Sequence, residues 1–235
     1  MSRKKVLITG GTRGIGFATA KLLVASGYEV LVTGKNVGGQ GPEGTRYFFC
    51  DFSDKKAAVD FARQMAEQKL DILINNAGIN KIGPLSDYPL DDFAAIQQVN
   101  VTTPFLLCKA VVPGMCQRHF GRIVNITSVF SVVSREQRSA YSASKFGLLG
   151  LSRALALEVA KENVLVNCLA PGFIETDMSQ EILGPQGIEE IVQRIPMNRM
   201  GRPEEIAHWV KFLVSEESSY LTGQNIIVDG GYTCE

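Results

Sequence analysis

Short apolar runs alternate with longer stretches of mixed polarity along most of the chain. The runs are rich in β-branched residues and are bounded by turn-forming residues, as is typical of buried strands. Between them, apolar residues recur every three or four positions, which indicates helices that bury one face. These patterns predict strands over residues 6–8, 28–33, 46–50, 71–74, 122–126, 164–169 and 225–228. They predict helices over residues 17–26, 54–68, 90–99, 105–117, 141–161 and 204–214.

This alternation predicts an α/β fold, a Rossmann-type doubly wound parallel sheet with helices on both faces. The chain holds 235 residues, enough for one large core, and shows no linker, repeat or low-complexity segment. Residues 34–44 hold five glycines and a proline, so we expect an irregular loop there. That loop is too short to separate domains, and we predict a single domain over residues 1–235.

The composition narrows the range of partners. Lysine plus arginine and aspartate plus glutamate both number 24, so charge gives no reason to expect nucleic acid or an anionic membrane as the main partner. The five cysteines have no paired spacing and indicate reduced thiols. Without an evident signal peptide or an apolar run of roughly 18 residues, we expect a soluble cytoplasmic protein. His119 and His208 suggest no ligand set, so we expect no metal, and we expect Trp209 to pack in the core.

The first predicted strand leads directly into a glycine-rich turn. Four glycines fall within the seven residues from Gly10 to Gly16, and a helical pattern follows. Strand, glycine turn and helix N-terminus form the geometry that holds a pyrophosphate, because the backbone can approach closely and its N–H groups point at the phosphates. The spacing Gly10-x-x-x-Gly14-x-Gly16 differs from that of most dinucleotide-binding folds. Alone, the turn fits either a dinucleotide site or an ordinary glycine-rich turn.

A dinucleotide in such a fold lies across the carboxyl ends of the strands. The second strand ends without a carboxylate to bind the ribose hydroxyls of NAD. We expect Gly34 to leave room for a 2′-phosphate and Lys35 and Arg13 to bind it, which favours NADP(H); the alternative is two solvated surface cations. Asp51, after the third strand, is either a partner of the adenine amino group or a capping residue. Residues 75–78, after the fourth strand, are either a simple turn or a segment that lets the backbone approach the cofactor ribose.

A tyrosine and a lysine share one face of a later helix. Tyr141 and Lys145 stand at positions i and i+4, and Ser128 follows the neighbouring strand. A phenol with a pKa near 10 is a poor acid or base at neutral pH, and a nearby cation lowers that pKa. The pair is therefore either part of a catalytic site or an ordinary pair on a surface helix.

Taken together, these motifs resemble the short-chain dehydrogenase/reductase family over nearly the whole chain. Thr9–Gly16 is similar to the coenzyme-binding turn of that family, and Asn75-Asn76-Ala77-Gly78 to its sheet-stabilising motif. Pro171-Gly172-Phe173-Ile174-Glu175-Thr176 resembles the segment that wraps the nicotinamide carboxamide. The expected cofactor-binding residues are Gly10, Thr12, Arg13, Gly14, Ile15, Gly16, Lys35, Asp51, Asn76, Ala77, Gly78, Tyr141, Lys145, Pro171, Gly172, Ile174 and Thr176.

The resemblance also implies catalytic roles, because Asn100, Ser128, Tyr141 and Lys145 fall at the positions of the family's tetrad. Tyr141 would donate a proton to the substrate carbonyl oxygen as hydride arrives from the nicotinamide. Ser128 would hydrogen-bond the same oxygen. Lys145 would bind the nicotinamide ribose and lower the tyrosine pKa, and Asn100 would hold a water that links Lys145 to solvent.

Within the family, residues 170–178 and 198–205 are most similar to 3-oxoacyl-[acyl-carrier-protein] reductases and related carbonyl reductases. We therefore expect an NADPH-dependent reductase of a small carbonyl compound, including acyl-carrier-bound 3-oxoacyl thioesters. The alternatives are a dehydrogenase of a small alcohol or sugar, and an NADP-binding regulatory protein without turnover. The residues expected to line the substrate pocket are Phe130, Val133, Gln137, Phe173 and Met178.

Two expectations concern assembly and motion. Helices 105–117 and 141–160 carry apolar faces wider than one core requires, and the family uses these helices as subunit interfaces, so we expect a homotetramer or a homodimer. Residues 175–199 contain two glycines and two prolines, which predicts a mobile lid over the substrate site.

Overall fold

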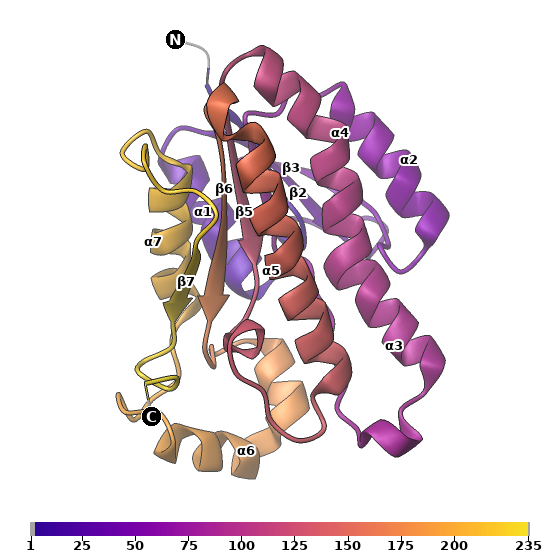
Figure 1. Cartoon of the computed structure of the whole chain (residues 1–235), viewed down its shortest axis with the longest axis vertical. Coiled ribbons are helices and arrows are strands. Elements are labelled where there is room, and N and C mark those ends of the chain that lie inside the picture. Colours follow the sequence, from indigo (N-terminus) through magenta and orange to yellow (C-terminus); the bar gives the residue numbers. More distant parts are fainter. Residues whose placement is uncertain (1–2, 235) are drawn as a thin grey trace.

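The computed structural model describes residues 3–234 and forms one parallel sheet between two layers of helices (Figure 1). Its strands are β1 (Lys5–Ile8), β2 (Glu29–Gly34), β3 (Thr45–Phe49), β4 (Ile72–Asn75), β5 (Gly121–Ile126), β6 (Val164–Pro171) and β7 (Asn225–Val228). Its helices are α1 (Gly14–Ala25), α2 (Lys55–Ala66), α3 (Leu90–Gln97), α4 (Thr103–Gln117), α5 (Ser139–Val159), α6 (Asp177–Gln193) and α7 (Pro203–Val214). The predicted fold class is confirmed.

The sheet has the strand order β3-β2-β1-β4-β5-β6-β7, and every neighbouring pair is parallel. From β1, the successive strands β2 and β3 lie on one side and the strands from β4 onward lie on the other, so the sheet has a topological switch point between β1 and β4. In sheets of this kind, ligands bind in a crevice at the switch point, outside the carboxyl ends of the strands. The residues that follow β1, β4, β5 and β6 are therefore brought to one end of the sheet.

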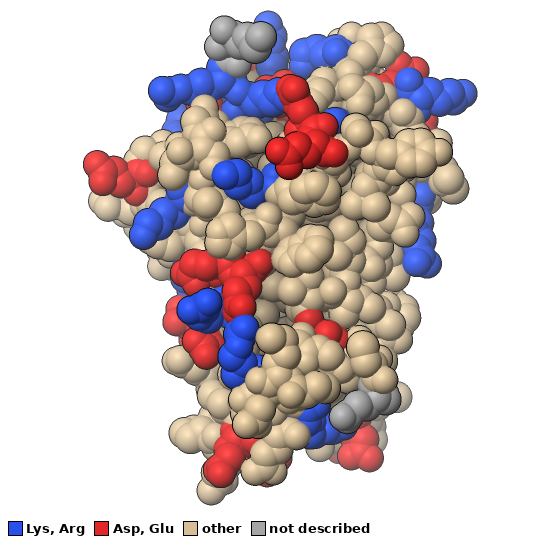
Figure 2. Space-filling view, turned by 90° about the vertical axis from the view of Figure 1, so that its left-hand side faces the viewer, with Lys and Arg blue, Asp and Glu red and all other residues tan. Residues whose placement is uncertain are grey.

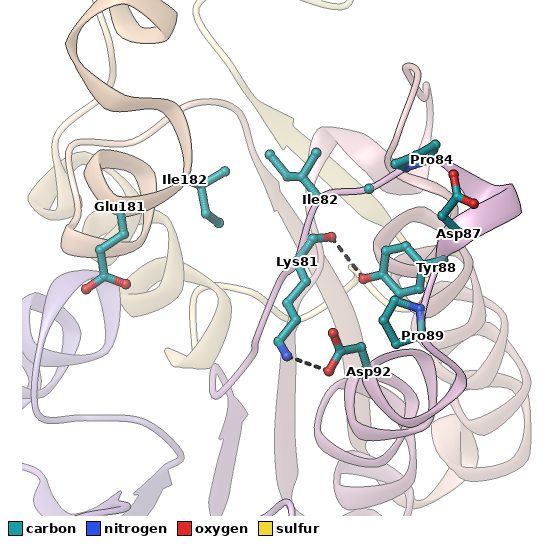
Figure 3. A pocket seen from close by; sticks show the side chains of 10 residues that line it. Lys81, Ile82, Pro84, Asp87, Tyr88, Pro89, Asp92, Glu181 and Ile182 are labelled. Carbon is teal, nitrogen blue, oxygen red and sulfur yellow. Dashed lines mark hydrogen bonds and ion pairs between the residues drawn. The ribbon is translucent and has the colours of Figure 1, made fainter.

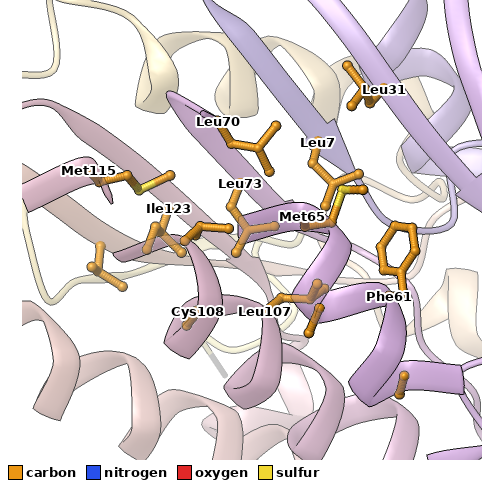
Figure 4. Close-up of a cluster of buried hydrophobic side chains, with 14 of the residues drawn as sticks. Leu7, Leu31, Phe61, Met65, Leu70, Leu73, Leu107, Cys108, Met115 and Ile123 are labelled. Carbon is orange, nitrogen blue, oxygen red and sulfur yellow. The ribbon is translucent and has the colours of Figure 1, made fainter. Parts of the chain in front are cut away.

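Successive residues of each strand enter different cores, because side chains alternate between the faces of a sheet. Leu7 packs with Met65, Leu107 and Ile123 in the cluster under α2 and α4 (Figure 4). Its neighbours in β1 instead join the cluster that α1 and α7 cover. Two fully covered faces account for the nearly continuous apolar runs that identified the strands in the sequence.

Two helical segments differ from the predictions. The two helices predicted over residues 90–99 and 105–117 form one helical run, because a π-helical turn, Gln98–Thr102, joins α3 and α4. The segment expected to form a lid contains α6, which kinks at Gly184 and lies beyond the carboxyl ends of β6 and β7 (Figure 1). Residues 35–44 form no helix, as predicted.

The helical run Leu90–Gln117 is long and apolar enough to cross a membrane by length and composition, with a mean hydropathy of 1.3. Its Ile96, Leu107 and Met115 side chains are fully buried inside the protein. We therefore interpret this run as a core element of the fold.

Trp209 contradicts the expectation that it packs in the core. Its side chain lies on α7 and is 42% exposed, and its ring packs edge-on against the exposed Phe212 ring at 6.5 Å. The pattern of apolar residues identified the buried face of α7. It could not show that the Trp209 side chain lies at the edge of that face.

Candidate active site

The glycine turn joins β1 to α1 and has the backbone geometry of a phosphate cradle. Gly10 and Gly14 have φ angles of +68° and +55°, which other L-residues rarely adopt. A Cβ atom on Gly16 would collide with the Gly10 carbonyl oxygen. No side chain caps α1, which begins at Gly14, so the first N–H groups of the helix have no intrahelical partner and are available to an anion.

Thr9 and Asn76 fix this turn to the end of β4. The Thr9 hydroxyl oxygen accepts hydrogen bonds from the backbone N–H groups of Asn76 at 3.0 Å and Ala77 at 2.9 Å. The Asn76 amide in turn donates to the carbonyl oxygens of Thr9 and Gly10, at 2.9 and 3.0 Å. Asn75 points the other way and donates to Asn125 of β5 at 2.7 Å. The sequence motif was recognised, but Thr9 was missed as the residue that joins its two halves.

Asn100 lies in the π-helical turn and holds the loop that follows Gly78. Its Oδ1 accepts from the Ile79 N–H at 2.9 Å, and its Nδ2 donates to the Ile79 carbonyl at 3.0 Å and to the Ser144 hydroxyl at 3.0 Å. A Cβ atom on Gly78 would lie 3.4 Å from Asn100 Oδ1 and 3.7 Å from Lys145 Nζ, so these three residues meet at one point. Turns of this kind occur frequently at functional sites.

Lys145 and Tyr141 lie on α5 beside the end of β5. The Lys145 ammonium is buried, donates to the Ile126 carbonyl at 2.8 Å and lies 5.4 Å from the centre of the Tyr141 ring. Burial lowers the pKa of Lys145 from its ordinary value to about 8, and the neighbouring Cys168 partly opposes this effect. The i, i+4 spacing therefore brings the two side chains together, as predicted.

The structure does not show the expected lowering of the Tyr141 pKa. Burial raises the pKa of Tyr141 to about 12, and the neighbouring Ser128 hydroxyl and the Arg138 charge only partly oppose it. Ser128 is itself buried, and its Oγ accepts from the Phe130 N–H at 3.2 Å. Tyr141 is thus a neutral phenol beside a serine hydroxyl, a state in which it can donate its proton.

The segment after β6 completes the crevice. The N–H of Gly172 donates to the Val228 carbonyl at 2.9 Å, which fixes residues 171–172 against β7. Thr176 caps α6, its Oγ1 accepting from the Ser179 N–H at 3.3 Å. A Cβ atom on Gly14 would lie 3.2 Å from Thr176 Cγ2, so the predicted nicotinamide segment does meet the glycine turn.

The end of the crevice near β2 and β3 differs from the expectation in one respect. A Cβ atom on Gly34 would lie 2.7 Å from Thr12 Cγ2 and 3.0 Å from the Tyr47 ring. The space beside Gly34 is therefore filled by side chains, and the idea that this glycine leaves room for a phosphate is wrong. Lys35 is exposed and its charge contributes to the lowered pKa of Asp51, whose main causes are the hydrogen bonds from Ser53.

Arg13 does not converge with Lys35 in this structure. Its Nη1 lies 3.5 Å from carboxylate oxygens of both Asp177 and Glu181 on α6, and its side chain is about half exposed. Exposed pairs at this separation contribute little to stability. The guanidinium can therefore leave these carboxylates for another anion.

A cavity of about 570 Å³ opens between α6 and the loop that follows β4 (Figure 3). Lys81 and Asp92 form an ion pair on one wall, and Glu181 and Ile182 of α6 face them. The Gly83 N–H donates to the Gln137 carbonyl at 3.3 Å, which joins this wall to the segment leading into Tyr141. The residues of the wall carry no catalytic motif, so the sequence did not indicate them.

Three aromatic rings continue from the Tyr141 ring toward α6. The Phe130 ring packs edge-on against both Tyr141 and Phe173 at 6.1 Å, and Phe173 against Tyr232 at 5.2 Å. Phe130 and Phe173 were expected in the substrate pocket. Tyr232 was not expected there, because it is far from both residues in the sequence and no local pattern shows that they meet. Within residues 3–234, no group of three or more His, Cys, Asp or Glu side chains could hold a metal ion.

Comparison with known proteins identifies this architecture. A family model described as Enoyl-(Acyl carrier protein) reductase matches residues 10–233. The chain is 36% identical to the 3-oxoacyl-[acyl-carrier-protein] reductase FabG of Chlamydia pneumoniae, over 98% of this chain and 97% of that protein. The chain belongs to the short-chain dehydrogenase/reductase family. The resemblance found in the sequence is thereby confirmed, and the protein is an NAD(P)-dependent oxidoreductase.

Solved structures of this family superpose closely on the chain. A protein from Beutenbergia cavernae assigned as an NAD(P)-dependent gluconate 5-dehydrogenase, solved with NADP, has a TM-score of 0.94 and 32% identity, and covers 100% of this chain and 98% of its own. A 4-hydroxyisoleucine dehydrogenase complexed with NADH has a TM-score of 0.91 and 30% identity, and covers 99% of this chain and 100% of its own. These short-chain dehydrogenase/reductases hold different nicotinamide cofactors.

Proposed function

We propose that this enzyme reduces a carbonyl compound to an alcohol with NADPH, and that Tyr141 is the general acid. The observation that carries this proposal is the meeting of Ser128, Tyr141, Lys145 and Asn100 at the carboxyl ends of β4 and β5. The glycine cradle beside them fits a dinucleotide, because α1 begins there without a side-chain cap and with glycines at positions 14 and 16.

Each of the four residues has its own role in the proposed reaction. Tyr141 holds its proton at Oη and passes it to the carbonyl oxygen, which Ser128 steadies by a hydrogen bond. Lys145 binds the nicotinamide ribose, and its ammonium stabilises the phenolate that remains after proton transfer. Asn100, bonded to the Ile79 backbone, holds a water through which Lys145 resupplies the proton. When bound, the nicotinamide supplies the hydride that reaches the carbonyl carbon.

The preference for NADP(H) follows from the end of β2. No carboxylate stands at residues 33–36 to bind the ribose hydroxyls of NAD or to repel a phosphate. Lys35 is exposed there, and Arg13 is held only by exposed ion pairs. We assign both cations to the 2′-phosphate and Asp51 to the adenine amino group.

The substrate class of the proposal includes 3-oxoacyl thioesters, free or bound to an acyl carrier, because relatives at 36% and 37% identity are 3-oxoacyl-[acyl-carrier-protein] reductases. The same groups run in reverse would oxidise a small alcohol or sugar, and the gluconate 5-dehydrogenase neighbour keeps that alternative open. A regulatory protein without turnover is the less favoured alternative, because all four catalytic residues are present.

We also propose that the enzyme is a cytoplasmic homotetramer or homodimer. Phe105 on α4 and Phe146 and Leu157 on α5 are 47%, 46% and 82% exposed, although α4 and α5 also cover the core. Apolar side chains gathered on one face of a protein often mark a subunit interface.

The test is a panel of 3-oxoacyl thioesters, ketones and keto sugars, each assayed with NADPH and with NADH, together with the matching alcohols in the reverse direction. We expect turnover of at least one carbonyl compound, faster with NADPH than with NADH. Absence of turnover across the panel, by protein that binds NADPH, would favour the regulatory alternative. Faster turnover with NADH would overturn the cofactor assignment alone.

A further inference from the structure

Arg138 carries a buried charge without a partner. The residue is 5% exposed, and its Nε and Nη1 atoms are buried without any hydrogen-bond partner among residues 3–234. No carboxylate in this part of the chain forms an ion pair with it. Burial, with a smaller effect from the Arg135 charge, lowers the pKa of Arg138. Because guanidinium remains protonated in proteins, this position keeps a cation that the fold itself does not neutralise.

The guanidinium lies near Tyr141 and the aromatic ring that packs against it. Arg138 is the residue before α5 and stands three positions before Tyr141. Its Cζ lies 5.8 Å from the centre of the Phe130 ring, and that ring packs edge-on against Tyr141. The Tyr141 and Tyr232 phenols also act on the pKa of Arg138, so both lie near the guanidinium.

Among residues 3–234, no carboxylate forms a hydrogen bond or an ion pair with the Arg138 guanidinium. The ring face of Phe130 favours a cation but cannot accept the guanidinium N–H bonds as a carboxylate would. The other titratable group that acts on Arg138 from its own loop is Arg135, which has the same charge. An unpaired buried cation beside a proton donor is the arrangement expected where a ligand brings the counterion.

We propose that Arg138 binds an anionic group of the substrate, a carboxylate or a phosphate carried on the same molecule as the reacting carbonyl. This inference rests on the proposed reductase function and narrows its substrate to oxo acids or oxo phosphates. Arg138 acts in binding and specificity, and Tyr141 and Ser128 act at the carbonyl. A guanidinium suits this role because it offers parallel N–H donors to either anion.

The test compares pairs of substrates in which only one member carries an anionic group: 4-oxopentanoate with its methyl ester, acetoacetate with methyl acetoacetate, and dihydroxyacetone phosphate with dihydroxyacetone. We expect the wild type to prefer the anionic member of at least one pair. Arg138→Gln should lower kcat/KM for that anion by about 10- to 150-fold, the range of a hydrogen-bonded charge contact, and leave the neutral partner within about three-fold. Which pair responds distinguishes a carboxylate from a phosphate.

Two variants control for charge and for folding. Arg135→Gln removes the same charge from an exposed side chain three residues away and should leave the preference unchanged. Arg138→Lys keeps the positive charge but loses the paired N–H donors of the guanidinium. It should retain part of the preference for the anion even where Arg138→Gln folds poorly. NADPH affinity, which involves neither arginine, should be the same in all variants and reports that each is folded.

A binding measurement separates this inference from the reductase assignment. Succinate and inorganic phosphate, titrated by calorimetry into the wild-type NADPH complex, probe the anion site without any reaction. Binding of either anion that Arg138→Gln abolishes supports the site even where no carbonyl is reduced. Equal kcat/KM for the acid and neutral members in wild type and Arg138→Gln, with no succinate or phosphate bound, would overturn the inference while the reductase activity stands.

Discussion

At the scale of single residues, Tyr141 and Lys145 show how burial and function oppose each other. Burial keeps the phenol neutral, with a pKa of about 12, and makes the ammonium easier to deprotonate, with a pKa of about 8. A donated proton requires the neutral phenol, and a stabilised phenolate requires the charged ammonium. Below pH 8 the phenol of Tyr141 is neutral and the ammonium of Lys145 is charged. The buried charge on Lys145 then lowers the free energy of unfolding, which is a cost in stability.

That cost predicts a pH-dependent effect of Lys145→Met. The pKa of Lys145 falls from 10.5 in the unfolded chain to about 8 in the fold, so the unfolded state binds more protons between these values. The destabilisation is complete below pH 8 and is relieved as the pH rises toward 10.5. We expect Lys145→Met to be more stable than wild type by roughly 3 kcal/mol at pH 7, and by about 2 kcal/mol less at pH 9.5.

Urea denaturation at both pH values measures this difference. Lys161→Met, which changes an exposed lysine just beyond α5, is the matched control. A variant less stable than wild type at pH 7, or a difference that grows with pH, would contradict the assignment of Lys145 as a buried cation.

The cofactor preference is also decided by single residues. Lys35→Ala should weaken NADPH binding by about 10- to 150-fold and leave NADH binding nearly unchanged, because only NADPH carries the 2′-phosphate. Isothermal titration of wild type and variant with both cofactors measures this. Equal affinities of the wild type for NADPH and NADH, or equal losses of affinity for both cofactors in Lys35→Ala, would contradict the assignment of Lys35 to the 2′-phosphate.

At the scale of elements, α6 is the least anchored helix beside the active site. Ile191 is its one buried side chain in the described structure, and Gly184 interrupts it with φ +62° and ψ 177°, a conformation that is essentially restricted to glycine. The two ends of the segment are held together where Glu175 and Phe173 exchange backbone hydrogen bonds with Gly201, at 2.8 and 2.9 Å. A segment pinned at its base and loosely packed beyond it has the construction of a lid.

Hydrogen exchange tests this element. We expect amides of residues 177–193 to exchange rapidly in the free enzyme and to slow by at least ten-fold when NADPH and substrate bind. Amides of residues 61–66, in the second half of α2, should not change and serve as the internal control, because this part of the helix packs in the core under the sheet. Slow exchange in the free enzyme that binding leaves unaltered would show that α6 is a fixed wall.

The sequence predicted the elements better than their junctions. Strand and helix patterns located the sheet, because buried parallel strands are continuously apolar and carry their own signal. The π-helical turn around Asn100 was missed, because it arises from side-chain and backbone bonds to Ile79 and Ser144 that no local pattern encodes. Likewise, Tyr141 and Lys145 followed from their spacing, whereas Arg138 and Tyr232 required knowledge of which distant segments meet.

At the scale of the whole molecule, two apolar faces remain uncovered. One lies on α4 and α5, around Phe105, Phe146 and Leu157. The other lies on α7 and β7, where Trp209 and Phe212 are exposed, and Figure 2 shows a broad area without charged side chains on this side of the molecule. A tetramer can bury both faces, whereas a dimer would leave one in water.

Leu157→Lys tests the α4 and α5 face. The side chain is 82% exposed in the monomer, so the substitution should not lower monomer stability, yet it would place a charge inside the proposed interface. We expect wild type to be a tetramer or dimer by light scattering and the variant to fall to a smaller assembly. Val37→Lys, at an equally exposed site, should leave the mass unchanged. A monomeric wild type, or an unaltered Leu157→Lys assembly, would contradict this interface.

The measurement closest to the central proposal is single-turnover reduction by Tyr141→Phe. The substitution keeps the ring and its packing against Phe130 and removes only the hydroxyl, so fold and NADPH affinity should survive. General acid catalysis contributes about 10²- to 10⁴-fold in rate, and we expect a loss of that size or larger with saturating NADPH and the best substrate of the panel. A Tyr141→Phe enzyme that binds NADPH like wild type and reduces the substrate within a few-fold of its rate would show that Tyr141 is not the proton donor.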